Sequence, residues 1–196
     1  MIPKATTLVF PGRSGCGKDT QVEFLKKHEK LPKAIEFSTG DYFREIAAKS
    51  TVLGKKAKAV LDAGGRQPDW FAFAMWLSVF GDVVKDEEIL FSSGSPRSLR
   101  EAGLIDEALE FTERPKATAI YLNVTREEAT KRLLGRGRGD DLRDNIENRM
   151  DYFERDVIPT VEYYRKDGRL IEVDGNPRPE EVFKELEQKL EKYFIK

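Results

Sequence analysis

The chain has 196 residues, 39% of them hydrophobic, and its 34 basic and 35 acidic residues leave a net charge of −1. This length and composition predict one folded domain and exclude disorder, and the charge balance argues against a nucleic-acid-binding surface. The single cysteine, Cys16, excludes an internal disulfide and is typical of a reducing compartment, so we expect a cytoplasmic protein. No apolar run approaches the roughly 18 residues of a membrane-spanning helix, and the first ten residues lack the pattern of a signal peptide, so we expect no membrane partner.

Short β-branched or aromatic runs alternate along the chain with longer segments of helical spacing. The predicted strands are 6–10, 34–37, 89–91, 117–124 and 170–173. The predicted helices are 20–30, 69–84, 101–111, 127–134, 142–166 and 180–194. Pro159 should kink the helix 142–166 or divide it in two. This alternation predicts an α/β fold in which helices cover both faces of a parallel sheet.

The stretch between the second and third predicted strands is longer than a simple crossover requires. It has helical spacing throughout, and Gly64-Gly65 and Pro68 end its first part. We therefore predict a small helical insertion over residues 39–69, followed by the helix that returns to the sheet. The aromatic residues of that helix are interpreted as core.

The strongest motif follows the first strand and opens the first helix. Gly12, Gly17 and Lys18 have the phosphate-loop spacing of Gly, four residues, Gly, Lys. The glycines let successive N–H groups turn toward a polyphosphate at the positive end of the helix, and Lys18 adds a mobile charge near the transferred phosphate. The motif departs from its usual form at Asp19, where Ser or Thr is expected, and Thr20 follows one residue later.

Further motifs resemble those of the adenylate kinase family of nucleoside monophosphate kinases. The resemblance runs nearly end to end, in shared order and spacing. It covers Lys18-Asp19-Thr20-Gln21, Ser38-Thr39-Gly40-Asp41 with Arg44, the segment 62–67, Ser93-Gly94-Ser95-Pro96-Arg97, the segment 132–136, Arg138, Asp140, Asp141, Arg149, and the segments 162–166 and 173–175.

The resemblance implies the phosphate-loop kinase fold, with a five-stranded parallel sheet flanked by helices. Its core would comprise residues 1–38, 70–134 and 140–196, with a monophosphate-binding insertion at 39–69 and a short lid at 135–139. It also implies a monomer that acts on ATP and a nucleoside monophosphate with Mg²⁺. Because the short lid lacks the cysteines of the long form, no structural zinc is expected.

The resemblance further implies roles for individual residues, and arginine suits many of them because its fork binds phosphate oxygens at two points. The expected catalytic residues are Lys18, Arg97, Arg132, Arg138 and Arg149. The expected ATP-binding residues are Gly12, Arg13, Ser14, Gly15, Cys16, Gly17, Lys18, Asp19, Thr20, Arg132, Arg136, Gly175 and Pro177. The expected monophosphate-binding residues are Thr39, Arg44, Gly65, Arg66, Gln67, Gly94, Ser95, Pro96, Arg97, Glu101, Arg138 and Arg149.

One departure from the family pattern concerns the metal. The family has an aspartate at the end of the third strand, where this chain has Ser93, and Asp19 stands where other phosphate loops have a hydroxyl. We predict that the carboxylate and the hydroxyl have exchanged places, and that Asp19, Asp41 and Ser93 contact Mg²⁺ mostly through water or ATP. The alternative is that Asp19 is an acidic residue favoured in the first turn of a helix.

A second departure concerns the acceptor base. Glu101 stands where the family's adenylate kinases have a glutamine that pairs with adenine, and a carboxylate only accepts hydrogen bonds, which suits guanine or cytosine better. Gln67 makes the pocket more polar still, whereas Thr39 keeps the adenylate pattern. Ser98 and Glu101 also fit a helix capping box, which needs no contact with the base. AMP is the default acceptor. The alternatives are GMP, CMP or UMP, and a nucleotide-binding module without turnover.

Overall fold

Five parallel strands form a single sheet in the computed structural model, which describes residues 2–28 and 34–195. The strands are β1 (Thr7–Phe10), β2 (Ala34–Ser38), β3 (Ile89–Ser93), β4 (Thr118–Asn123) and β5 (Leu170–Asp174). Their order across the sheet is β2-β3-β1-β4-β5, and all neighbours are parallel. The α/β fold with a parallel sheet is therefore confirmed, and each of the five predicted strands is present.

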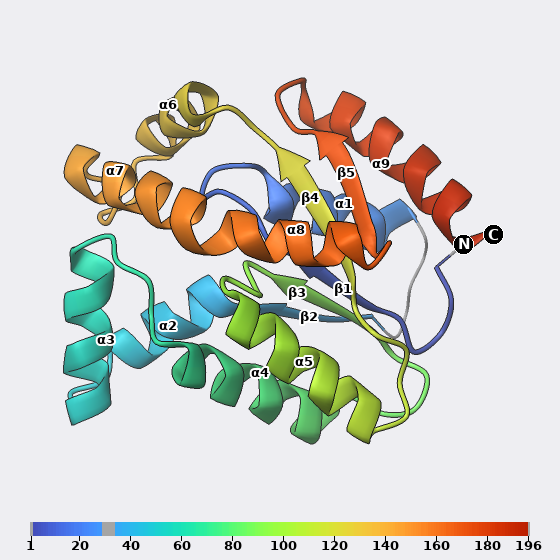
Figure 1. Ribbon diagram of the computed structural model, residues 1–196. Helices are drawn as coiled ribbons and strands as arrows, with labels where there is room; N and C mark the ends of the chain where they lie inside the picture. Colours follow the sequence, from blue (N-terminus) through green and yellow to red (C-terminus); the bar gives the residue numbers. More distant parts are fainter. Residues whose placement is uncertain (1, 29–33, 196) are drawn as a thin grey trace.

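Helices connect the strands in the predicted alternation (Figure 1). They are α1 (Lys18–His28), α2 (Thr39–Ala47), α3 (Val52–Asp62), α4 (Asp69–Val83), α5 (Leu99–Phe111), α6 (Arg126–Arg136), α7 (Arg143–Tyr152), the π-helical turn η1 (Phe153–Val157), α8 (Ile158–Lys166) and α9 (Pro179–Phe194). The predicted end of the first helix at residue 30 lies outside the described residues. No helix in the described part of the chain is long and apolar enough to cross a membrane.

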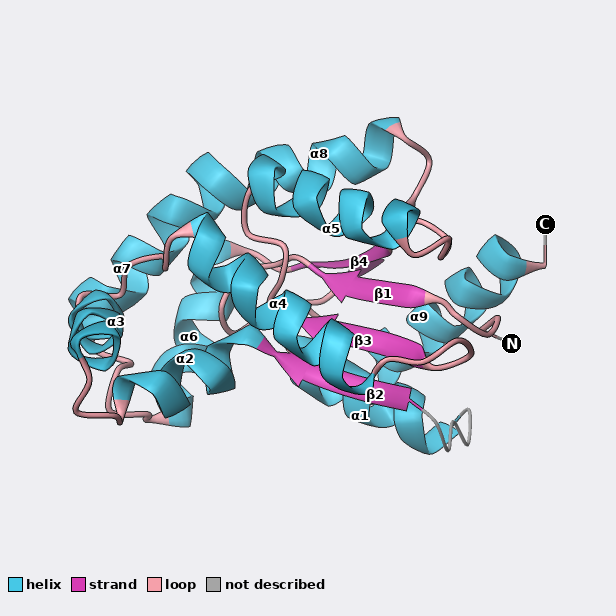
Figure 2. Ribbon diagram, turned by 90° about the horizontal axis from the view of Figure 1, so that it is seen from below, coloured by secondary structure: helices cyan, strands magenta, loops and turns pink. Residues whose placement is uncertain are grey.

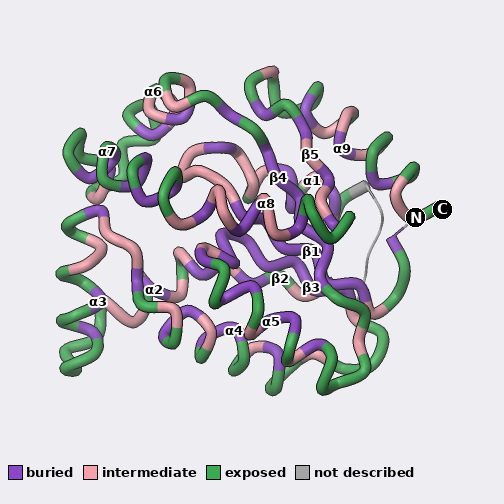
Figure 3. Tube along the Cα trace, viewed as in Figure 1, coloured by how far each residue is buried: buried purple, intermediate pink, exposed green. Residues whose placement is uncertain are grey.

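The sheet is buried on both faces, and its central strands appear as a purple band in Figure 3. On one face, Val22 of α1 and Leu186 of α9 pack in the same cluster as Leu8 of β1. On the other face lie α4, α5 and α8 (Figure 2), and Trp76 of α4 is buried in the same cluster as Val9 of β1. Neighbouring strand residues point to opposite faces, so β1 feeds both clusters. Each fully buried large apolar side chain contributes about 1.5–3 kcal/mol to this packing.

The predicted break at Pro159 takes the form of a wide helical turn. Helices α7, η1 and α8 follow one another as a continuous rod, drawn in orange across the sheet in Figure 1. Proline has no N–H, and its ring clashes with the carbonyl four residues earlier, so a regular α-helix cannot pass through this position unchanged. The chain widens into the π turn just before Pro159, and the Thr160 hydroxyl donates to the Asp156 carbonyl at 3.2 Å.

Helices α2 and α3 form the predicted helical stretch between β2 and α4, and their far end contacts α7. Gly64 has a φ of +64°, and a Cβ there would lie 2.4 Å from the Asn145 carbonyl oxygen. The Asn148 amide donates to the Ala63 carbonyl at 2.9 Å. The end of the stretch that follows α3 therefore contacts α7. The domain limits of 39–69 and 135–139 stay predictions.

Candidate functional site

A cleft of about 350 Å³ opens at the carboxyl edge of the sheet. In the strand register, Phe10 of β1, Ser38 of β2 and Ser93 of β3 are neighbours, so the three loops that follow these strands converge there. Ligands of open parallel sheets bind at this edge, where the strand order reverses. The cleft is lined by Ser14, Gly15, Gly17, Lys18, Asp19, Thr20, Ser38, Gly40, Phe43, Arg44, Leu61, Gly65, Ser93, Gly94, Arg97, Arg132, Leu133, Arg136, Arg138, Asp140, Arg149 and Tyr152.

The phosphate loop forms the floor of this cleft on one side. Gly15 and Gly17 have φ angles of +82° and +92°, which L side chains rarely adopt, and a Cβ on Gly15 would lie 2.8 Å from the Ala129 carbonyl oxygen. The Lys18 ammonium is 3.5 Å from the Arg13 carbonyl oxygen, a long contact that leaves most of its charge for an anion. The loop therefore presents N–H donors and one ammonium at the start of α1, the arrangement that binds phosphate.

Asp19 and Ser93 meet at the same end of the cleft. The Ser93 hydroxyl donates to an Asp19 carboxylate oxygen, and both residues line the cleft beside Lys18. A carboxylate and a hydroxyl are hard oxygen donors, and Mg²⁺ is held by few protein oxygens with the rest from water and phosphate. The pair thus fits a magnesium ion carried by a nucleotide. Asp41 is not among the lining residues, and its carboxylate pairs with Arg44. Burial alone would raise the pKa of Asp41, but the hydrogen bonds from Arg44 and Ser38 bring it below its usual range.

The opposite side of the cleft carries Arg44 and Arg97. The Arg97 Nε donates to the Gly94 carbonyl at 2.6 Å, one terminal nitrogen donates to the Thr39 hydroxyl at 3.2 Å, and the guanidinium lies 5.8 Å from the centre of the Phe43 ring. Thr39 is 1% exposed and is not a lining residue; its hydroxyl accepts from Arg97 and donates to the Gly94 carbonyl. These contacts hold the Arg97 guanidinium in place without a bound anion.

Two arginines, at the end of α6 and on α7, are organised around one buried carboxylate. Asp141 accepts from Arg136 at 2.8 and 2.9 Å and from Arg149 at 2.9 Å, and its side chain is fully buried. Burial opposes its ionisation, but the hydrogen bond and charge of Arg136, with the bond from Arg149, hold the pKa of Asp141 below its usual range. Arg149 also pairs with Asp140 at 2.6 Å. Asp141 thus holds two arginines that, with Arg138, line the cleft.

A second cavity of about 560 Å³ adjoins the phosphate loop. It is lined by Cys16, Gly17, Thr20, Gln21, Glu128, Arg132, Gly175, Asn176, Pro177, Arg178, Pro179, Glu181 and Val182. Arg132 donates to the carbonyls of Gly175 and Asn176 at 2.9 Å each, so it connects α6 to the loop after β5. Arg132 and Gly17 line both cavities, which makes the second one a continuation of the first.

Several predicted site residues turn their side chains away from the cleft. Gln67 is buried and donates to the Ala57 carbonyl at 2.9 Å. Arg66 pairs with two carboxylates, and Arg13 leaves the phosphate loop toward η1. Gly12, Ser95 and Pro96 belong to the loops without being lining residues. The roles assigned to all of these residues stay predictions.

Glu101 is fully buried and both of its oxygens have partners within the protein. One accepts from the Ser95 hydroxyl at 2.5 Å and the other from the Arg97 N–H at 2.8 Å. The Ser98 hydroxyl accepts from the Glu101 N–H at 3.1 Å, as in a capping box, but the carboxylate bonds to the residue before Ser98. Burial raises the pKa of Glu101, and the bonds from Ser95 and Arg97 oppose this only in part. This arrangement favours a structural role in the loop 93–98.

The cleft also includes residues that sequence reasoning did not assign as ligand contacts: Ser38, Gly40, Phe43, Leu61, Leu133, Asp140 and Tyr152. Helical spacing could have identified one of them. Tyr152 lies about one turn after Arg149, which also lines the cleft, so the two share a face of α7.

The fold and these cavities define a phosphate-loop nucleotide-binding protein. A family model described as adenylate kinase matches residues 10–169. The chain is 33% identical to the adenylate kinase of Oenococcus oeni, over 92% of this chain and 95% of that protein. It is 32% identical to the adenylate kinase of Leuconostoc mesenteroides (95% and 98% covered) and 31% identical to that of Archaeoglobus fulgidus (94% and 98% covered). The chain therefore belongs to the adenylate kinase family, as its motifs predict.

Proposed function

We propose that this protein transfers the terminal phosphoryl group of ATP to AMP, reversibly, to give two molecules of ADP. The observation that carries the proposal is the charge of the cleft. Its lining includes Lys18 and six arginines but only two carboxylates, although the chain as a whole has a net charge of −1. So concentrated a positive charge fits two polyphosphate anions held together. Membership of the adenylate kinase family favours AMP over GMP, CMP or UMP, and favours turnover over simple binding.

The two sides of the cleft suit the two nucleotides. The phosphate loop and Lys18 would hold the donor phosphates, and the second cavity, beside Arg132 and Gly175, has room for the donor adenosine. Arg44 and Arg97 would hold the acceptor phosphate. Arg138 and Arg149, which also line the cleft, would contact the transferred phosphoryl group. Phosphoryl transfer asks the protein mainly to align two anions and neutralise the charge that develops, which this arrangement can do.

Magnesium would enter with ATP, where it neutralises phosphate charge and helps orient the transferred group. Asp19 and Ser93 would face it, directly or through water, while Asp41 stays paired with Arg44. Among residues 2–28 and 34–195, no group of three or more His, Cys, Asp or Glu side chains is arranged around a possible metal. A nucleotide-borne ion needs no such cluster, and the predicted lack of structural zinc stays a prediction.

Closure of the short lid would keep water away from the transferred group, as the lids of adenylate kinases do. Gly137 ends α6 in the left-handed conformation, with a φ of +64°, and so turns the chain from Arg136 toward Asp141. We further expect a monomer that acts in the cytoplasm on these two nucleotides and requires neither nucleic acid nor membrane.

The proposal is tested by measuring ADP formation from Mg²⁺-ATP with AMP, GMP, CMP and UMP as acceptors. The highest kcat/KM is expected for AMP, because the chain belongs to the adenylate kinase family. If no acceptor gave a nucleoside diphosphate, the proposal that the protein is an enzyme would be rejected. If another acceptor gave the highest kcat/KM, AMP would be rejected as the preferred substrate.

A further inference from the structure

Arg13 connects the phosphate loop to the π turn η1. Its Nε donates to the Val124 carbonyl at 3.0 Å, and its guanidinium lies 4.2 Å from the centre of the Phe153 ring. A terminal nitrogen pairs with Glu154 at 2.5 Å, and the arginine side chain is only 11% exposed. An arginine that stacks on a ring and pairs with a carboxylate is held at several points, so its side chain retains little conformational freedom. These contacts therefore restrict the position of the Arg13 backbone, and Arg13 is the second residue of the phosphate loop.

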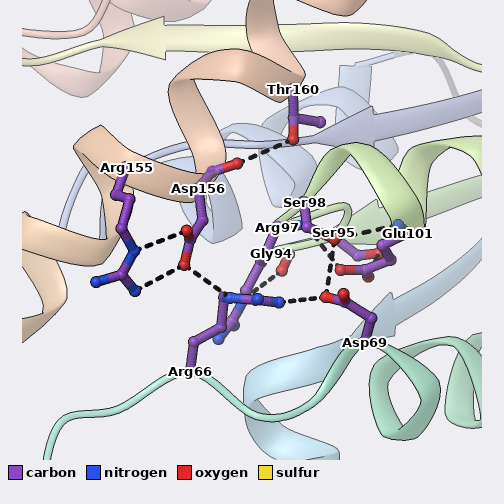
Figure 4. A network of polar contacts seen from close by, with 10 residues as sticks. All are labelled: Arg66, Asp69, Gly94, Ser95, Arg97, Ser98, Glu101, Arg155, Asp156 and Thr160. Atoms are coloured by element: carbon purple, nitrogen blue, oxygen red, sulfur yellow. Dashed lines mark hydrogen bonds and ion pairs between the residues drawn. The ribbon is translucent and has the colours of Figure 1, made fainter.

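Arg66 makes a corresponding connection from the acceptor side of the cleft. It pairs with Asp69 at the start of α4 and with Asp156 of η1, the latter at 3.0 Å. Figure 4 shows its guanidinium between these two carboxylates, with the Ser98 hydroxyl also donating to Asp69, at 2.8 Å. Arg66 directly follows Gly65, which lines the cleft. Its ion pairs therefore hold the wall of the cleft against the same π turn.

The π turn can serve both loops because Glu154 and Asp156 are two residues apart. Residues two apart on a helical turn point to nearly opposite sides. Phe153 and Val157, each 1% exposed, anchor the turn in the core, where Phe153 stacks on Tyr121 of β4. The turn is thus rigidly seated while its two carboxylates reach outward in different directions. π turns within α-helices are frequent at functional sites.

We propose that η1 is a positioning element for the reaction, with Glu154 aligning the donor loop through Arg13 and Asp156 aligning the acceptor wall through Arg66. The inference deepens the proposed function and rests on it. Neither carboxylate lines the cleft, so each acts through its arginine and not on a nucleotide. Loss of one ion pair should therefore increase the mobility of one loop and weaken the binding of the nucleotide on that side alone.

The test compares Glu154→Gln and Asp156→Asn, which keep the side-chain shape and remove the charge. Glu162→Gln is the matched control, because Glu162 lies on α8 and pairs only with Arg165 of the same helix among the contacts described. The dissociation constants of ATP alone and of AMP alone are measured by calorimetric titration, and KM and kcat for both in the ADP assay. Separate titrations require no turnover, so they remain informative even if the wild type forms no ADP, a result that would count against the proposed function and not against the alignment.

Glu154→Gln should raise the dissociation constant and KM of ATP about three- to tenfold and leave those of AMP within about twofold. An effect of this size is expected because partly buried ion pairs contribute somewhat more than exposed ones. Asp156→Asn should show the reverse selectivity, and Glu162→Gln should change neither. Arg66→Met keeps the aliphatic stem but also removes the pair with Asp69, so it should weaken AMP binding selectively and at least as much as Asp156→Asn. Adding Asp156→Asn to Arg66→Met should have no further effect. Unchanged constants, equal changes for both nucleotides, or additive effects of the Arg66 and Asp156 changes would overturn the inference. Should Asp156→Asn fail to fold, Arg66→Met provides the acceptor-side measurement.

Discussion

The Ser93 hydroxyl donates a hydrogen bond to the Asp19 carboxylate, which connects the end of β3 to the first turn of α1 across 74 positions of the chain. The two residues meet because β1 and β3 are neighbours and Phe10 and Ser93 are in register. The carboxylate thus comes from the helix and the hydroxyl from the strand, and that the two contact magnesium stays a prediction.

If Asp19 contacts the metal, Asp19→Gly should raise the Mg²⁺ concentration needed for half-maximal ATP binding by about tenfold, because one charged oxygen donor near the ion is lost. The double change Asp19→Gly with Ser93→Asp should recover part of that loss by returning a carboxylate to the strand. The measurement is a titration of ATP binding at a series of Mg²⁺ concentrations. If the magnesium dependence of Asp19→Gly were unchanged, Asp19 would not contact the metal and would only be an acidic residue favoured in the first turn of a helix.

Lys18→Ala should lower turnover at least about a hundredfold, since a well-placed cation at the transferring group contributes roughly 3 kcal/mol or more to transition-state stabilisation. The fold should persist, because the only hydrogen bond of the ammonium among the described residues is a long one, to the Arg13 carbonyl. ADP formation and far-ultraviolet circular dichroism are measured for both proteins. Equal rates would show that the phosphate loop does not take part in the chemistry.

Asp141→Asn should lower the free energy of unfolding by about 3 kcal/mol at pH 7, because it leaves Arg136 and Arg149 without their shared carboxylate. The pKa of Asp141 is lowered in the folded protein, so its contribution is present above the usual carboxyl pKa of 3.8 and is lost as the pH falls through the lower folded value. The difference between wild type and variant should therefore be constant near neutral pH and shrink below about pH 4.

Denaturant titrations from pH 3 to pH 8 measure this difference. Asp151→Asn is the control, because Asp151 makes an exposed ion pair with Arg126 whose loss should cost about 0.5 kcal/mol or less. A difference that grew on acidification would mean that Asp141 is neutral in the folded protein.

Glu101→Gln should leave the order of the four acceptors unchanged and alter the kcat/KM ratio of AMP to GMP by less than about threefold, far below the effect of losing a base contact. The reason is that Ser95 and Arg97 already occupy both carboxylate oxygens, and a glutamine can accept from the Arg97 N–H and donate to the Ser95 hydroxyl. A shift of preference toward AMP would show instead that Glu101 reads the base.

The same variant should change the pH dependence of stability. Burial raises the pKa of Glu101 above its usual 4.5, so the folded wild type loses stability as the pH rises from that value through the folded pKa. Glutamine does not titrate, so the stability of Glu101→Gln relative to wild type should increase over that interval. Thermal unfolding at pH 4 and pH 8 tests this, and a constant difference between the two proteins would contradict the raised pKa.

The strands, most helices and the phosphate loop could be predicted from the sequence because each depends on neighbours in the chain. The spacing of Gly12, Gly17 and Lys18 after a β-branched run needs no distant contact to be recognised. The arginines could be assigned to two nucleotides only through the family resemblance, since any one arginine in so charged a chain looks like a surface residue.

The orientation of side chains within those motifs was decided by tertiary structure. Arg13 and Arg66 lie in predicted nucleotide-binding segments, yet Glu154 and Asp156, about 90 or more positions away, draw both side chains toward η1. The structure buries Glu101 with Ser95 and Arg97, where the sequence left a base contact and a helix cap equally open. Local sequence thus determined the elements and the chemistry at the edge of the sheet. The direction of each charged side chain depended on which opposite charge the fold brought within reach, because a buried charge is stable only where a partner meets it.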